Sequence, residues 1–152
     1  MELADAIREA LERQVLEHEP GQAALVLRDA VGDVGPETVA RGLLDGAAVA
    51  LRRMVAETDD VLDQDELLQR LAFDGAVPQE NVELLGRMLG FAAATAGGVR
   101  PPFAPVLDEL GPERALFGAW LGVLTVIRVV ALSLGRTEAE ITEDVVTALH
   151  TT

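Results

Sequence analysis

The sequence predicts an all-α fold, a single-domain helical bundle of about six or seven helices. Apolar residues recur at helical spacing along nearly all of the chain, and the two-residue alternation of half-buried strands is almost absent. Aromatic residues, which favour strands, account for only 3% of the sequence. The 152 residues are enough for one hydrophobic core but not for two, so residues 1–152 are expected to form one domain.

Proline residues delimit the helices predicted in the first part of the chain. Three helices are expected, over residues 2–18, 22–31 and 36–57. Apolar residues every three or four positions give the first of them an apolar face, and Pro20-Gly21 follows its end. A loop over residues 32–35 precedes Pro36, which is favoured at the first position of a helix because no helical partner for its N–H exists there.

Capping residues mark the helices predicted in the second part. We expect a helix opened by Asp63 and further helices over residues 79–96, 112–134 and 138–150. Asp63 and Thr137 each precede a glutamate by three residues, which is the capping-box pattern. These helices are separated by a loop over residues 73–78, an extended connector over residues 100–105 and a short turn over residues 106–110.

An internal repeat is indicated when the sequence is aligned with itself at an offset of 76 residues. Gly35-Pro36-Glu37 then matches Gly111-Pro112-Glu113, and the helices that follow stay in register. Three further pairs coincide: Gly42 with Gly118, Gly46 with Gly122, and Arg52 with Arg128. We therefore predict two similar helical units, residues 1–76 and 77–152. The alternative is coincidence, because Gly-Pro-Glu is a common way to open a helix.

Glycines at four-residue spacing form a second pattern. The stripes are Gly42 and Gly46, Gly86 and Gly90, and Gly118 and Gly122, each inside a predicted helix. A glycine in a helix interior is about 1 kcal/mol less favourable than alanine, so the pattern needs a reason. Without a Cβ atom, two helix axes can approach closely. We expect these glycines to lie at tight helix crossings within the domain.

Composition excludes several classes of function. The 26 acidic residues outnumber the 12 basic ones, and the formal net charge of −14 repels nucleic-acid phosphates and anionic membrane surfaces. The chain has no cysteine and no lysine, which excludes disulfides, thiolate and cysteine–zinc chemistry, Schiff bases and the P-loop lysine. Met1 is followed by acidic residues instead of a basic and apolar leader, so a cytoplasmic protein is expected.

Few side chains are suited to catalysis. His18 and His150 fall at predicted helix ends, where an imidazole interacts with free carbonyl groups, and neither follows a glutamate by three residues as di-iron bundles require. Ser133 has no histidine near it in the sequence. The acidic segment 59–66 has leucine where a calcium loop needs ligands or glycine. We expect no enzyme activity, no metal and no cofactor.

The most apolar predicted helix covers residues 112–134. Its length approaches that of a membrane span, but Arg128 would then lie in lipid at a cost of about 2.5–3.5 kcal/mol. A buried central helix is the better interpretation, so no membrane insertion is expected. Because valine and isoleucine flank Arg128 in the sequence, we expect its guanidinium to be buried and paired with a carboxylate, from segment 59–66 or from Asp108 or Glu109.

One face of this helix carries the functional prediction. Its residues recur every three or four positions: Phe117, Leu121, Thr125, Val129 and Leu132. The aligned positions in the first half include Arg41, Asp45 and Arg53, so folding does not demand an apolar stripe here. We therefore predict that a second protomer covers the stripe of the second half, with Gly118 and Gly122 allowing close approach.

The sequence thus predicts a non-enzymatic helical protein-interaction or regulatory module that forms a homodimer or binds another protein. The alternative is a binding protein for a small apolar or anionic ligand. Its pocket would be floored by Gly118 and Gly122, and Arg128 would hold a carboxylate or phosphate. The candidate residues for interface or pocket are Phe117, Gly118, Leu121, Gly122, Thr125, Arg128, Val129 and Leu132.

Overall fold

Proline and glycine mark most helix boundaries in the computed structural model, which describes residues 2–58 and 79–151. The α-helices are α1 (Leu3–Leu11), α2 (Pro20–Val34), α3 (Pro36–Thr58), α5 (Val82–Ala96), α6 (Ala104–Leu110), α7 (Pro112–Leu134) and α8 (Glu138–Thr151). A π-helical turn over Glu12–Leu16 extends α1, and a 3₁₀ turn over Gln79–Asn81 precedes α5. The described residues contain helices and no strand, so the predicted all-α fold is confirmed.

Two predicted boundaries are wrong. The loop expected over residues 32–35 is helical up to Val34, because a single Gly32 is tolerated in a helix and the break comes only at Gly35, whose φ is +89°. The short turn expected over residues 106–110 belongs to α6, and so do the last two residues of the connector expected over residues 100–105, because α6 begins at Ala104 and accepts Pro105 in its first turn. The predicted helix opened by Asp63, the acidic segment 59–66 and the predicted loop over residues 73–78 lie outside the described residues.

Helix ends elsewhere follow the predicted chemistry. Gly135 ends α7 in the left-handed conformation with φ of +65°, as a glycine C-cap does. The backbone N–H of Glu140 donates to Thr137 Oγ1 at 3.2 Å, which is the expected cap of α8. The predicted starts of α3 and α7 at Pro36 and Pro112 are both confirmed.

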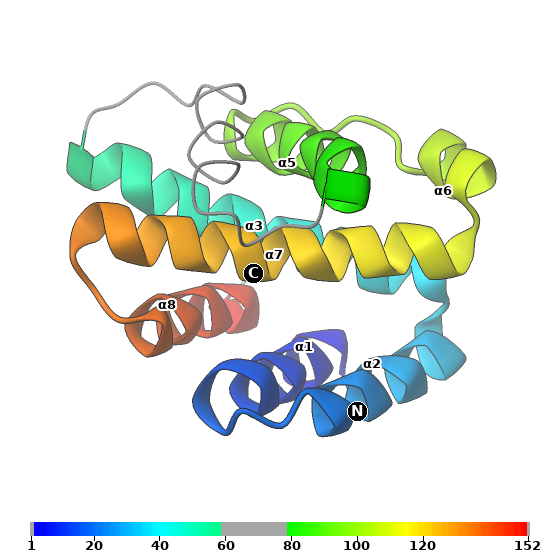
Figure 1. Cartoon of the computed structure of the whole chain (residues 1–152), viewed down its shortest axis with the longest axis horizontal. Coiled ribbons are helices and arrows are strands. Elements are labelled where there is room, and N and C mark those ends of the chain that lie inside the picture. Colours follow the sequence, from blue (N-terminus) through cyan, green and yellow to red (C-terminus); the bar gives the residue numbers. More distant parts are fainter. Residues whose placement is uncertain (1, 59–78, 152) are drawn as a thin grey trace.

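The centre of the bundle is the pair α3 and α7, which run side by side in the same direction (Figure 1). Gly46 of α3 and Gly122 of α7 each lie within van der Waals distance of the other central helix, although their shortest approaches are to α8 and α5. A Cβ atom on Gly46 would lie 3.8 Å from Val123 Cγ2, and one on Gly122 would lie 3.8 Å from Leu44 Cδ2. The helix predicted to be central therefore shares that position with α3.

The remaining helices cover the central pair from two sides. In Figure 1, α5 and α6 lie on one side, and α1, α2 and α8 lie on the other. The shortest approaches again involve glycine: a Cβ on Gly42 would lie 2.7 Å from Ile7 Cδ1 of α1, and one on Gly118 would lie 2.9 Å from Leu84 Cδ1 of α5. The close packing predicted within the domain is therefore confirmed for Gly42 and Gly118, whereas for Gly86 and Gly90 it stays a prediction.

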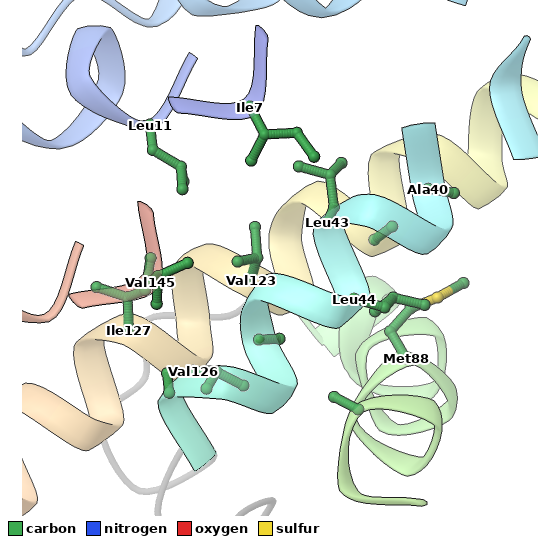
Figure 2. Packing of buried hydrophobic residues seen from close by; sticks show 14 of the residues in the cluster. Ile7, Leu11, Ala40, Leu43, Leu44, Met88, Val123, Val126, Ile127 and Val145 are labelled. Carbon is green, nitrogen blue, oxygen red and sulfur yellow. The ribbon is translucent and has the colours of Figure 1, made fainter. Parts of the chain in front are cut away.

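Neighbouring side chains of α3 serve opposite sides of the core. Figure 2 shows Leu43 pointing toward Ile7 of α1, while Leu44 points toward Met88 of α5. All four side chains are buried. Because α3 has apolar residues around most of its circumference, it can contact α1, α2, α5, α7 and α8 at once.

Helix α7 is long and apolar enough to cross a membrane by length and composition alone. In the bundle, however, 61% of its most apolar window is buried by the protein itself. Core helices of soluble proteins have the same length and composition, so this feature gives only weak support to a membrane role.

The two central helices also resemble each other, as the internal alignment predicts. Each has 23 residues, and each follows a glycine with nearly the same backbone angles: φ and ψ are 89° and 159° at Gly35, and 86° and 156° at Gly111. Outside this pair the halves differ, since α2 has 15 residues and its counterpart α6 has seven. Duplication of the whole chain remains a prediction.

Candidate functional site

The apolar stripe predicted on α7 is not one open face. Thr125 and Val129 are buried and Leu121 is half-buried, while Phe117 is 48% exposed and Leu132 is 66% exposed. The two exposed residues lie 15 positions apart, near opposite ends of the helix. Surface that a partner could contact therefore remains only at the two ends of the stripe.

Gly118 and Gly122 are occupied within the chain. Leu84 and Met88 of α5 would lie 2.9–3.0 Å from a Cβ on Gly118, and Met88 Cβ would lie 3.3 Å from one on Gly122. These glycines position α5 against α7, so they are not available to a second protomer or to a ligand.

The predicted burial of Arg128 is wrong, and so is its predicted pairing with Asp108 or Glu109; the predicted pairing with segment 59–66 involves residues outside the described part of the chain. The side chain of Arg128 is exposed, and it makes no ion pair with any residue in the ranges 2–58 and 79–151. The physical reason is helical geometry, since residues adjacent in sequence point about 100° apart. Arg128 lies four positions from Leu124 and Leu132, on the partly exposed side of α7, whereas Val126, Ile127, Val129 and Val130 point into the core.

The exposed Phe117 belongs to a groove between α2 and α7, which we call the α2/α7 groove. It has a volume of about 500 Å³. It is lined by Ala24, Leu27, Arg28 and Val31 of α2 and by Glu113, Leu116, Phe117 and Trp120 of α7. Each set follows the three- or four-residue spacing of one helix face, so the groove has two continuous walls.

The aromatic residues of the described part of the chain divide between the core and this groove. Phe91 and Phe103 pack edge to face at a centroid distance of 5.4 Å, and Phe103 is fully buried. Phe117 and Trp120, by contrast, both line the α2/α7 groove, and Trp120 is the single tryptophan of the chain. Aromatic residues with exposed rings are enriched where protein surfaces bind partners.

The charges on the groove are balanced and unpaired with each other. Arg28 lies on the α2 wall and Glu113 on the α7 wall, and both are exposed. Within the described part of the chain neither makes an ion pair. On a protein with a net charge of −14, this groove is therefore locally neutral.

Other polar groups do not assemble into a site. Among the described residues, no group of three or more histidine, aspartate or glutamate side chains could hold a metal ion. The side chains of His18, Ser133 and His150 are exposed and lie at separate positions, with His18 in the left-handed conformation at φ of 54°. The described pockets are lined by residues other than Gly118, Gly122 and Arg128, so the predicted ligand pocket has no structural counterpart among them.

Sequence reasoning missed the α2 wall, Trp120 and the pair Arg28 and Glu113. A signal was present, because Ala24, Leu27 and Val31 continue an apolar face of α2 beyond what one neighbouring helix covers. The single Trp120, one turn from Phe117, was a second signal.

Comparisons with family models, with curated proteins and with solved structures find no match for this chain.

Proposed function

We propose that this protein is a helical interaction module that self-associates through the α2/α7 groove. The observation that carries the proposal is the exposed Phe117 beside Trp120 in a locally neutral groove of an otherwise strongly acidic chain. Removing such aromatic surface from water stabilises an interface by roughly 25 cal/mol per Å² of apolar area. Charge repulsion between two copies is weakest where the contact surface itself carries no net charge.

The charges of the groove favour a second copy of the same chain as the occupant. Arg28 and Glu113 stand on opposite walls, and neither has an ion-pair partner among residues 2–58 and 79–151. In a two-fold dimer the same patch meets itself, so Arg28 of each protomer faces Glu113 of its partner. Stable dimers bury about 800 Å² per protomer, so the contact extends beyond the groove to neighbours such as Leu25, which is 52% exposed on α2.

Sedimentation equilibrium tests the proposal directly. The wild-type chain should sediment as a dimer of the 16.1 kDa protomer, and Phe117→Asp should sediment as a folded monomer. Phe117 is half exposed in the isolated chain, so this change disturbs the core little. Fluorescence gives an independent reading, because emission from Trp120 reports on the groove alone and should shift to longer wavelength in the monomer.

A charge exchange tests the arrangement of the dimer. Arg28→Glu and Glu113→Arg should each weaken the dimer, because each places like charges opposite one another. The double variant restores opposite charges and should recover most of the affinity. Arg128→Glu serves as the matched control, since Arg128 is an exposed arginine on α7 that does not line the groove. A wild-type chain that is monomeric at all concentrations would overturn the proposal.

A further inference from the structure

Near the two ends of the described chain, His150 of α8 meets Asp5 of α1. His150, near the end of α8, lies with Nε2 2.6 Å from Asp5 Oδ1 of α1 and with Nδ1 2.9 Å from the carbonyl oxygen of Val146. Both side chains of the pair are about one-third exposed, so protons can reach them from solvent. The sequence predicts a role for His150 at a helix end but gives no indication of Asp5, which is 145 residues away.

With Asp5 ionised, both contacts can be hydrogen bonds at the same time only if both ring nitrogens carry a proton. A carboxylate oxygen and a peptide carbonyl oxygen both accept hydrogen bonds and cannot donate them. A neutral imidazole has one N–H, so its second nitrogen would direct a lone pair at one of these oxygens. Only the imidazolium can donate to both at once, and its positive charge also faces the carboxylate of Asp5 and the carbonyl end of α8.

We propose that His150 is a proton-dependent clasp, which fastens the last turn of α8 to α1 when protonated and releases it when the pH rises. Release matters for α1 because the same helix packs Leu3 and Ile7 over Gly42 of α3. The clasp therefore controls how firmly the N-terminal helix is held on the central pair. This inference stands on α1 and α8 and is independent of the α2/α7 groove.

The charged groups around His150 support this direction. The hydrogen bond to Asp5 raises the pKa of His150, the carbonyl of Val146 raises it further, and partial burial and Arg8 act in the opposite sense. The same hydrogen bond to His150 lowers the pKa of Asp5. Arg8 reaches Asp5 Oδ1 at 3.9 Å, so it can replace the imidazolium as the partner of Asp5 once His150 is neutral.

Among the described residues, Asp5 and Arg8 of α1 are the charged groups that act on the pKa of His150. Helix α3 faces this end of α8 through Gly46, close to Val145 and Leu149. Its Arg53 pairs with Asp144, nearly two turns earlier on α8. Arg13 of the π-helical turn is held by Glu17 and Glu19.

The stability of the fold should follow this titration with a definite sign. The pKa of His150 is raised in the folded chain, so the contribution of the clasp is complete below the unfolded value of about 6.5 and is lost as pH rises through the folded value. At the acid end the contribution falls again as pH drops through the lowered pKa of Asp5. The clasp is therefore strongest in mildly acidic solution.

Nuclear magnetic resonance titration of the full chain tests the clasp. The His150 imidazole signal, assigned by its loss in His150→Gln, should titrate at lower pH in Asp5→Asn than in the wild type. Glu2→Gln is the matched control, because it removes an exposed carboxylate before α1 that makes no contact with His150. An unchanged His150 midpoint in Asp5→Asn would overturn the proposal.

Amide hydrogen exchange gives a second reading. The protection factors of the first turns of α1 should fall as His150 loses its proton in the wild type, and they should be independent of pH over this range in His150→Gln. Equal protection of α1 above and below the His150 midpoint in the wild type would also overturn the clasp.

Discussion

Helices α3 and α7 have equal length and follow nearly identical glycine bends, yet they use their polar residues in different ways. The arginines of α3 fasten other segments: Arg41 donates to the carbonyl of Pro101 at 2.9 Å, Arg52 to the carbonyls of Thr95 and Ala96, and Arg53 pairs with Asp144 at 2.6 Å. The arginine of α7 that aligns with Arg52 is Arg128, which is exposed and has no ion pair among the described residues.

This comparison corrects the sequence interpretation of α3. Its charged stripe does not simply face water, because Arg41, Asp45 and Arg53 are only half-exposed and bind the connector before α6 or helix α8. Asp45, for instance, accepts from Arg100 at 3.0 Å. The charged stripe of α3 and the apolar stripe of α7 can therefore both make contacts within the same chain. The difference between the stripes of α3 and α7 is therefore not evidence for a partner protein. The evidence for a partner comes from the α2/α7 groove.

The largest expected effect concerns the point where the two helices are most alike. Gly46→Leu and Gly122→Leu should each destabilise the fold by about 3 kcal/mol, because Gly46 packs closely against Val145 of α8 and Gly122 against Met88 of α5. A Cβ at Gly122 already meets Met88 Cβ at 3.3 Å, and that atom is fixed to the backbone of α5. The free energy of unfolding in urea measures the loss.

Gly32→Leu is the control for this pair of changes. Gly32 is exposed in α2 and has nothing within 4 Å of a Cβ, so leucine should be tolerated or slightly stabilising there. If Gly46→Leu is costly and Gly122→Leu is not, the central pair is packed less symmetrically than the shared glycines indicate.

A smaller effect is expected at the glycine bends. Gly35→Ala and Gly111→Ala should each destabilise by about 2 kcal/mol, because φ near +89° and ψ near 159° are accessible essentially to glycine alone. Nothing lies within 4 Å of a Cβ at either site, so the loss is purely one of backbone conformation. Thermal and urea unfolding should give equal losses for the two variants.

The control for these bends lies three residues before the first of them. Gly32→Ala, in ordinary helical conformation, should stabilise the chain by up to about 1 kcal/mol. Markedly different losses at Gly35 and Gly111 would show that the matching angles do not have matching roles.

Local chemistry explains how much of this fold could be predicted. The starts of α3 and α7 follow from Pro36 and Pro112, and the end of α7 follows from Gly135, because each residue restricts its own backbone. The glycine crossings were also predictable, since an unfavourable residue repeated on a helix face needs a packing reason. These features depend on residues within one or two turns of each other.

The parts that could not be predicted depend on contacts far apart in the sequence. The partner of Arg41 is 60 residues away and that of His150 is 145 residues away, and no local pattern identifies either. The α2/α7 groove combines two helices whose separate patterns indicate only apolar faces. Arg128 was misjudged because its neighbours in sequence were used in place of its neighbours on the helix surface.

The smallest expected effect separates the two aligned arginines. Arg52 Nη2 donates to the carbonyl of Thr95 at 2.8 Å and Nε to that of Ala96 at 3.2 Å, so the guanidinium caps the last turn of α5. Arg52→Gln should therefore cost about 1 kcal/mol, a value limited by exposure to solvent. Arg128→Gln removes the same charge from the equivalent position of α7 and should change the free energy of unfolding by less than about 0.5 kcal/mol. Amide exchange locates the effect, because only Arg52→Gln should accelerate exchange in the last turn of α5. If both variants lose the same free energy of unfolding and exchange in α5 does not change, the loss comes from the change in net charge and not from the cap that Arg52 provides to α5.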